Sequence, residues 1–409
     1  MKANKRPSIL TRIKSLDPAF LTFLRMQACY TSLVTIMGIF LNTFLLKALG
    51  DQKTVMVYNM ILAAVQPFAM VLACRMIRKV SPKAAQGVSF GLYALCFLCL
   101  AILGEGAASY YILFAAALST SAGFFYTVYT LQIVSLTDDA NLDLCTGLQT
   151  MLSSAIGFVL PLLSGTFLAA FSGFAGYRVL FGAALALAGM ALFFSLRIPR
   201  LRGFDYDPRP CFTDTARAIL HTAQPRRMML MTVFAGIKEG TFSFIITTLI
   251  YQMIKNEAFV GLTGSLGSVA AVLAAGVYGA VVRPRMRGKS VIFTTVFVSC
   301  ICAMLYFRMD PVTLLLFHLA VSFSTPFIVT AQVNTYYSVV QHVDALAGKG
   351  AETHSMREMF YAAGRILGIL ILMVMPDTPA GQVTALLILL LSQLVSGHLV
   401  SVTQKELKI

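Results

Sequence analysis

Three charged side chains interrupt long apolar runs of this chain. Lys238 and Glu239 are consecutive in the segment FAGIKEGTFSF, and Arg365 lies in an apolar run near the C-terminus. A charge at the centre of a bilayer costs about 2.5 to 3.5 kcal/mol even on the lenient insertion scale. Such residues indicate either a structural ion pair between two helices or a site for coupling or substrate binding, and both alternatives stay open here.

Two further charges belong to the same question. Glu358 precedes Arg365 by seven residues, so both lie on one face of a helix. Arg25 lies about two turns inside the first apolar run. We expect its guanidinium to reach the lipid headgroups, and a role in a cavity is the alternative.

Other patterns of catalytic or metal-binding residues are weak. The run from Arg287 to Ser290 is similar to the end of a phosphate-binding loop, but Arg283 stands where that loop needs a glycine. The closely spaced cysteines lie in apolar segments without neighbouring histidines, so we expect them to pack rather than bind metal. The five histidines are scattered, whereas an enzyme needs clustered catalytic groups. We expect no enzyme activity, no metal and no cofactor.

The elements that position these residues are predicted to span a membrane. The chain is 58% hydrophobic and 12% charged, with a mean hydropathy of +0.79, which leaves too little polar surface to cover a soluble protein of 44.4 kDa. About 20 apolar residues cross the hydrocarbon core of a bilayer. Runs of this length predict an all-α integral membrane protein with twelve helices, near residues 20–46, 54–74, 87–104, 110–136, 146–171, 177–196, 228–251, 261–282, 290–307, 313–341, 356–375 and 383–402.

One long polar run, residues 197–227, divides the chain into two halves. It contains seven arginines and four prolines, so we interpret it as a cytoplasmic linker that forms no buried core element. Asp17 and Pro18 have the residue types of an N-cap and a first helical position, which predicts that the first helix begins there. The predicted domains are a cytoplasmic segment at 1–19, a bundle at 20–196, the linker at 197–227, a second bundle at 228–402 and a cytoplasmic tail at 403–409.

The distribution of basic residues explains the formal net charge of +15. With both termini in the cytoplasm, 24 lysines and arginines lie on the cytoplasmic side and five on the outside, which follows the positive-inside rule. We therefore expect a multi-pass protein of the plasma membrane with cytoplasmic N- and C-termini. Its basic residues would contact anionic membrane lipids, and we expect no nucleic-acid partner.

The segment MVLACRMIRK resembles the signature between helices 2 and 3 of the major facilitator superfamily. Arg75, Arg78 and Lys79 match its basic positions. At the corresponding place of the second half, GAVVRPRMRGK matches through Gly279 and Arg287, and Arg287 follows Arg78 by 209 residues. This spacing resembles the internal repeat expected of that family, and the resemblance implies two pseudo-symmetric six-helix bundles. The resemblance also implies a gating role for these arginines and for Lys79.

Two shorter segments add to the resemblance. GFVLPLLSG, residues 157–165, is similar to the glycine and proline stretch of helix 5, which usually accompanies export, and GYRVLF, residues 176–181, is similar to the entry to helix 6. The family's fold places helices 1, 4, 7 and 10 around a central cavity. It implies the polar and aromatic cavity residues Gln27, Tyr30, Tyr126, Tyr129 and Asn334.

Together these features predict a secondary active transporter that moves a small solute across the plasma membrane by alternating access. A cavity rich in aromatic groups suits an amphiphilic or lipid-like solute, and the helix 5 segment favours efflux by an antiporter. Pairing with Arg365 or Lys238 would control when Glu239 holds a proton, so we expect proton coupling. We expect a monomer. The alternatives are a lipid-modifying membrane enzyme and a non-transporting sensor built on a transporter scaffold.

Overall fold

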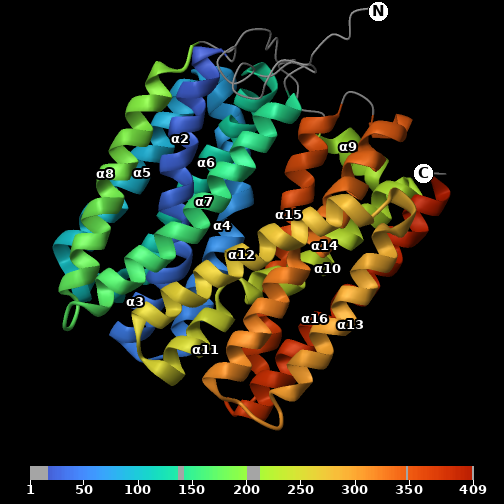
Figure 1. Cartoon of the computed structure of the whole chain (residues 1–409). Coiled ribbons are helices and arrows are strands. Elements are labelled where there is room, and N and C mark those ends of the chain that lie inside the picture. The colour runs from blue at the N-terminus through green and yellow to red at the C-terminus, as the bar shows by residue number, and fades with distance from the viewer. Residues whose placement is uncertain (1–16, 137–141, 200–211, 347–348, 408–409) are drawn as a thin grey trace, which may run out of the picture.

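The computed structural model describes residues 17–136, 142–199, 212–346 and 349–407, and these residues form helices and no strand (Figure 1). The first half of the chain forms α2 (Pro18–Ile36), the π-helical turn η1 (Met37–Leu41), α3 (Asn42–Leu49), α4 (Gln52–Lys79), α5 (Pro82–Leu103), the 3-10 turn η2 (Gly104–Tyr110), α6 (Tyr111–Leu136), α7 (Leu142–Ala169) and α8 (Ala175–Arg197). The second half forms α9 (Phe212–His221), α10 (Ala223–Phe242), α11 (Ile245–Ile254), α12 (Glu257–Val281), η3 (Pro284–Met286), α13 (Arg287–Met304), α14 (Pro311–His342), η4 (Asp344–Leu346), α15 (Gly350–Val374) and α16 (Pro379–Glu406). The predicted all-α membrane fold class is confirmed.

Ten stretches of the described residues are long and apolar enough to cross a membrane. One of them, residues 82–133, contains both α5 and α6, which pack against each other. α15 is not among the ten because charged side chains, Arg365 included, interrupt its apolar sequence. With these two adjustments the helices agree with twelve spans, although the number of crossings itself stays a prediction.

Several helices begin at side-chain caps rather than at the edges of their apolar runs. The Asp17 carboxylate accepts a hydrogen bond from the Ala19 N–H at 2.8 Å, which confirms the predicted start of the first helix. α5 begins at Pro82, five residues before its predicted start, because the Ser81 hydroxyl caps it. Hydropathy marks the part of a helix that lies in hydrocarbon, and helix ends extend beyond that part.

The predicted linker at 197–227 is only partly a linker. Residues 200–211 lie outside the described residues, but α9 and the first turn of α10 occupy much of the remainder. α9 places Thr215 and Ile219 on one face, one helical turn apart, and both are buried. Ile219 packs with Met228 and Met229 at the start of α10. The expectation that this run forms no buried element is wrong for residues 212–221, because the short apolar stripe of α9 finds a partner surface.

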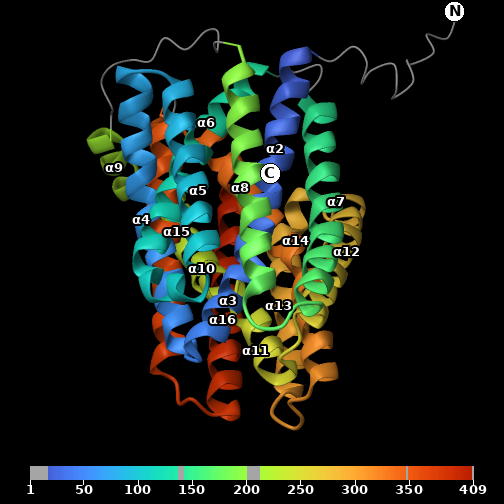
Figure 2. The same ribbon diagram turned by 90° about the vertical axis from the view of Figure 1, so that its left-hand side faces the viewer.

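The two halves of the chain form two groups of helices that lie side by side. Figure 1 shows α2 to α8 on one side and α10 to α16 on the other, and the view in Figure 2 shows the first group in front of the second. The groups meet where α7 packs against α12, α4 against α15 and α3 against α11. Side chains far apart in the sequence therefore meet along these seams.

Candidate functional site

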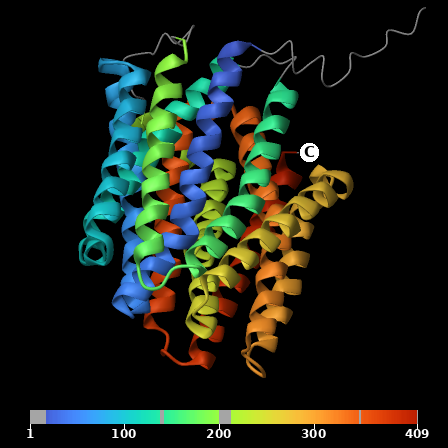
Figure 3. The ribbon, with the colours of Figure 1, turned by 60° about the vertical axis from the view of Figure 1, so that its left-hand side comes forward.

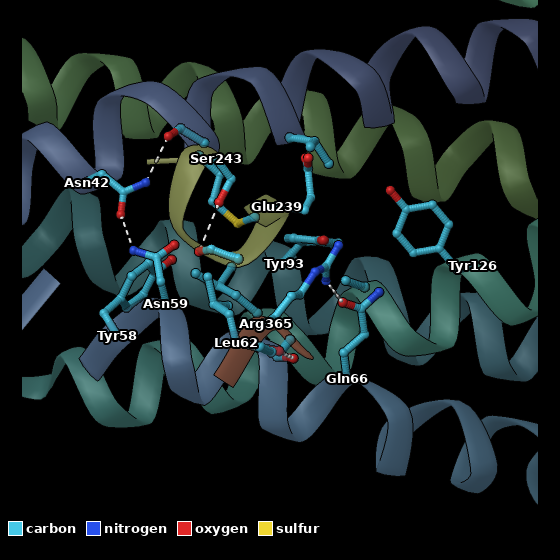
Figure 4. A pocket seen from close by; sticks show the side chains of 18 of the residues that line it. Asn42, Tyr58, Asn59, Leu62, Gln66, Tyr93, Tyr126, Glu239, Ser243 and Arg365 are labelled. Carbon is cyan, nitrogen blue, oxygen red and sulfur yellow. Dashed lines mark hydrogen bonds between the residues drawn. The ribbon is translucent and has the colours of Figure 1, made fainter. Parts of the chain in front are cut away.

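A cavity of about 240 Å³ lies between the two halves (Figure 4). Helices from α2 to α6 line it on one side, and α10 and α15 line it on the other. Its polar and charged lining residues are Tyr30, Asn42, Tyr58, Asn59, Gln66, Tyr93, Ser119, Tyr126, Glu239, Ser243 and Arg365. Glu239 and Arg365 are its two charged side chains, so the charges that stand out in the sequence meet at one place.

Two departures from regular α-helix border this cavity, one in the first helix of each half. The π-helical turn η1 separates α2 from α3, and Met37 and Gly38 line the cavity there. The helix of the second half is interrupted at Ser243 and Phe244, between α10 and α11, and Ser243 also lines the cavity. π-turns and interrupted membrane helices occur often at functional sites, because they change the direction of backbone and side-chain groups.

Glycines hold α15 close enough to α10 to bring Arg365 beside Glu239. A Cβ added to Gly240 would lie 2.5 Å from the Arg365 Cα, and one added to Gly236 would collide with the Tyr361 carbonyl oxygen of α15. Small residues at such positions let two helix backbones approach in a membrane. The positions of both cavity charges therefore depend on this glycine contact.

Glu239 and Arg365 do not form an ion pair with each other in this structure. Arg365 Nη1 donates to the Gln66 side-chain oxygen at 3.3 Å, and its guanidinium lies 4.4 Å from the centre of the Tyr361 ring. The Glu239 side chain is 32% exposed, and its ion-pair partner among the described residues is Lys238 at a distance of 4.0 Å. The predicted structural ion pair between these two helices is thus not formed, and both charges can still bind a ligand.

Lys238 lies apart from the cavity although it is next to Glu239. Its residue is 3% exposed, and its ammonium lies 3.5 Å from the Thr325 hydroxyl and 5.6 Å from the centre of the Phe242 ring. It therefore points into the second helix group. Of the two consecutive charges, Glu239 is the one that a solute in the cavity can reach.

Neutral polar groups complete the wall opposite Glu239 and Arg365. Asn59 donates to the Asn42 side-chain oxygen at 2.8 Å, and Asn42 donates to the Gly38 carbonyl at 2.8 Å. The buried Tyr58 hydroxyl has no hydrogen-bond partner in the described part of the chain. The wall thus combines aromatic rings with amides and an unpaired hydroxyl.

The other residues predicted for the cavity are spread over several places. Gln27 and Tyr129 line a second cavity beside α7 and α12. Arg25 is exposed and lines neither cavity, which fits a side chain that reaches the headgroups. Glu358 pairs with its neighbour Arg357 at 3.1 Å and does not reach the Glu239 cavity.

The residues predicted from helix 10 and from the gating signature lie elsewhere. The Asn334 carbonyl accepts a hydrogen bond from the Ser338 hydroxyl, which itself accepts one from Arg287 at 3.4 Å. Asn334 therefore lies outside both cavities. Arg75 and Lys79 are exposed at the end of α4, and Arg78 is half-buried there. Their gating role stays a prediction.

A polar contact joins the two halves near the predicted outer face. The Lys47 ammonium at the end of α3 lies 2.6 Å from the Glu257 carboxylate at the start of α12. The Tyr177 hydroxyl donates to the same carboxylate at 3.3 Å. Gln252 donates to the Gln52 side chain at 3.1 Å, also across the two halves. These contacts close the seam between the halves on this side.

Asn59, Gln66 and Tyr93 are cavity residues that the sequence alone did not single out. They lie on α4 and α5, whereas the family resemblance implied a cavity built from other helices. A signal was present, because Asn59 and Gln66 are polar residues seven positions apart in an apolar helix and share one face. A neutral polar side chain inside a membrane is also costly, although less so than the charge of Glu239, and this cost could have identified Asn59 and Gln66.

Known membrane transporters have the same fold as this chain. The nucleoside transporter NupG superposes with a TM-score of 0.69 at 14% identity over 95% of this chain and 100% of NupG. A bacterial homologue of the human drug peptide transporters PepT1 and PepT2 gives 0.66 at 10% identity, over 95% and 97% of the two chains. A peptide transporter POT variant gives 0.68 at 15% identity, over 95% and 94%. At these identities the likeness shows the fold alone.

The sequence relatives have no described activity. The uncharacterized protein YqgE of Bacillus subtilis is 24% identical over 354 residues, which are 87% of this chain and 82% of YqgE. An uncharacterized protein of Geobacillus stearothermophilus is 24% identical over 196 residues, which are 47% of this chain and 92% of that protein. No family model matches the sequence.

Proposed function

We propose that this protein is a secondary active transporter, with the cavity of Glu239 and Arg365 as its substrate site. One observation carries the proposal: two opposite charges from different helices face one cavity between the halves and do not neutralise each other. The fold of the similar structures favours transport over the membrane-enzyme alternative. The closed contact at Lys47 and Glu257 also supports alternating access, in which one side of the cavity is closed at a time.

The cavity lining favours a solute that has both polar and apolar parts. Tyrosine rings and amide groups line it, and Figure 4 shows Glu239 and Arg365 between Asn59 on one side and Tyr126 on the other. The solved structures of this fold include a nucleoside transporter and peptide transporters. We propose a small amphiphilic solute, exported across the plasma membrane by a monomer with cytoplasmic termini.

Glu239 is the proposed proton carrier. It is exposed to the cavity, its ion-pair contact with Lys238 is long, and Arg365 lies close enough to pair with it after a small rearrangement of α10 against α15. Proton binding in one conformation and release in the other would link transport to the proton gradient, because a ligand shifts a conformational equilibrium only through its different affinity for the two states.

Flux in proteoliposomes with an imposed proton gradient tests this proposal. The panel contains nucleosides, short peptides, cationic drugs and lipid analogues. We expect Glu239→Gln to lose gradient-driven flux while it keeps substrate exchange, and Arg365→Ala to weaken substrate binding and shift the pH dependence of flux. Glu105→Gln, which changes an exposed carboxylate in η2, serves as the matched control. Normal gradient-driven flux in Glu239→Gln across the pH range would remove the proton-carrier role, and no flux of any panel compound in the unmodified protein would contradict transport itself.

A further inference from the structure

A second cavity, of about 640 Å³, lies at the seam between α7 and α12. Figures 1 and 3 show these helices crossing at one end and diverging toward the other. At the crossing, the hydroxyls of Ser265 and Ser268 donate to the carbonyls of Phe158 and Gly157 at 2.6 and 2.8 Å. Past it, Gly276 has no atom of another helix within 4 Å of an added Cβ. The seam is thus closed at the crossing and open beyond it.

Two buried amides face this cavity, each with one unpaired atom. Gln27 is 9% exposed and Gln149 is 7% exposed. The Gln27 Oε1 and the Gln149 Nε2 have no hydrogen-bond partner among the residues that the structure describes. The Gln149 Oε1 accepts a hydrogen bond from the Tyr129 hydroxyl at 3.0 Å, and this bond fixes the orientation of the Gln149 amide. Buried polar atoms normally have partners, so an unpaired acceptor and an unpaired donor that line one cavity point to a ligand group that both donates and accepts, such as a hydroxyl or an amide.

The rest of the cavity lining is uncharged. Among the described residues it consists of serine, threonine, glycine, alanine and valine together with Tyr129, and none of these lining residues is a lysine, arginine, aspartate or glutamate. A charged headgroup placed there would lose its hydration without gaining a counter-charge, which is costly. The chemistry of the lining therefore selects a neutral headgroup.

An apolar groove continues from this cavity to the membrane-facing surface. It shares Ser154, Ser268 and Val272 with the cavity and adds Phe158 and Leu273. Phe158 is 42% exposed and Leu273 is 62% exposed. Such a groove between two membrane helices suits a hydrocarbon chain, because its walls are mostly apolar and the Ser268 hydroxyl already donates to the Gly157 carbonyl.

The seam cavity also lies next to the Glu239 cavity. Gln27 and Tyr129 line the former, and Tyr30 and Tyr126, each one helical turn away on α2 and α6, line the latter. A molecule bound at the seam is therefore about one turn of helix, roughly 5 Å, from the proposed substrate site.

We propose that the seam cavity binds an uncharged amphiphile. Its hydroxyl or amide headgroup bonds to Gln27 and Gln149, and its hydrocarbon tail extends between α7 and α12 into the membrane. This inference rests on the proposed function in one respect: the seam is then the lateral entry through which the substrate of the transporter passes from the bilayer to the Glu239 cavity.

Photolabelling of the full chain in nanodiscs tests this site. The probe is a photoactivatable monoacylglycerol, and competing lipids are unlabelled monoacylglycerol and anionic phosphatidylglycerol. We expect saturable labelling of peptides that contain residues 149–158 and 268–276. Gln27→Leu and Gln149→Leu should each weaken probe binding about tenfold, as expected for loss of one buried hydrogen bond, and Gln382→Leu, a glutamine at the opposite end of the molecule, should bind normally.

A second variant covers the case in which the glutamine variants do not fold. Ser154→Phe places a ring inside the seam cavity, and its folding is checked by gel filtration and thermal unfolding. We expect it to lose the labelling. Equal labelling in Ser154→Phe or in the double glutamine variant would overturn the proposal, and so would displacement of the probe by phosphatidylglycerol as effectively as by monoacylglycerol.

Failure of this inference can be told apart from failure of the proposed function. Saturable seam labelling without gradient-driven flux supports the binding site and contradicts transport. Glu239-dependent flux of a water-soluble solute without seam labelling supports transport and contradicts the lateral entry.

Discussion

Lys238 and Glu239 are adjacent in the sequence and lie in different surroundings. Lys238 is buried in the second helix group with one long hydrogen bond to Thr325, whereas Glu239 faces the cavity. A buried charge whose partners are distant contributes little to stability, because its desolvation offsets its attractions. The Glu239 side chain is partly solvated, so its charge needs the Lys238 ammonium less than a fully buried carboxylate would.

We therefore expect Lys238→Met to keep or raise thermal stability. Methionine retains most of the side-chain volume and removes the desolvation cost. Replacing a buried ion pair by apolar groups is often neutral or stabilising by about 1 to 4 kcal/mol, and here the remaining partner, Glu239, is 32% exposed and stays solvated. Thermal unfolding in detergent measures the effect. Lys238→Ala is the control that leaves a cavity and should lower the Tm; a larger fall in Lys238→Met than in Lys238→Ala would show that the charge itself holds the fold.

The charged part of the cavity could be predicted from single residues, because a charge inside a membrane is energetically costly. Glu239 and Arg365 were found because their polarity is expensive in a membrane, and they do line the cavity with Tyr30 and Tyr126. The direction of a side chain around its helix depends on neighbouring helices, which the sequence of one helix does not contain. Asn334 therefore lies outside the cavity, although it has the expected residue type.

At the scale of helices, the crossing of α7 and α12 depends on small residues. A Cβ at Gly261 would collide with the Pro161 carbonyl oxygen, and one at Gly165 would lie 2.5 Å from the Glu257 carbonyl oxygen. The two helices are in contact through their backbones at this point. The glycine and proline stretch at 157–165 was predicted from its resemblance, but its partner Gly261 was not.

Gly261→Ala should push α7 and α12 apart and lower the Tm. The added methyl group has no room, and such overpacking costs about 1 to 3 kcal/mol. Gly279→Ala changes the same helix where nothing lies within 4 Å of the new Cβ, so we expect no loss there. Equal Tm values for Gly261→Ala and the unmodified protein would show that the two helices separate easily.

The existence of most helices could be predicted, and their local irregularities could not. Apolar runs locate a helix because the bilayer demands internally bonded backbone. The π-helical turn at Met37–Leu41 has no such signal, since the sequence stays apolar through it, and the polar residues before Ser243 do not indicate that the helix is interrupted there. α9 was missed because only one short face of it is apolar, and that face needs the surface of α10 to become buried.

For the whole molecule, the outer contact of Lys47 with Glu257 favours one arrangement of the two halves. Glu257 is 6% exposed and bonds to Lys47 and Tyr177, both of the first half. In the proposed alternating-access cycle, this contact would break when the predicted outer side opens. The division into halves was indicated by the repeated basic motif, but which face is closed depends on contacts between residues 210 positions apart.

Lys47→Met should shift the molecule toward outer opening. The variant leaves the Glu257 carboxylate buried without a cation, which costs about 3 to 5 kcal/mol for a fully buried pair, and opening rehydrates it. Labelling of Ala122→Cys, a cavity position, by a membrane-impermeant maleimide added outside measures the shift. We expect faster labelling in Lys47→Met, partial recovery in Lys47→Met with Glu257→Gln, and no change in Lys53→Met, which alters an exposed lysine. Unchanged labelling in Lys47→Met would mean that this ion pair does not control the outer closure.

The position of α9 also determines where the chain can be divided into two polypeptides. Ile219 covers Met228 and Met229, so α9 belongs structurally with the second half although it precedes the first long helix of that half. A break placed within 200–211 leaves this cover on the second fragment, so we expect the two fragments to assemble in the membrane as a complementing pair. A break between His221 and Ala223 separates α9 from the second fragment. We expect that fragment to expose the apolar surface of Met228 and Met229, which favours aggregation before the first fragment binds.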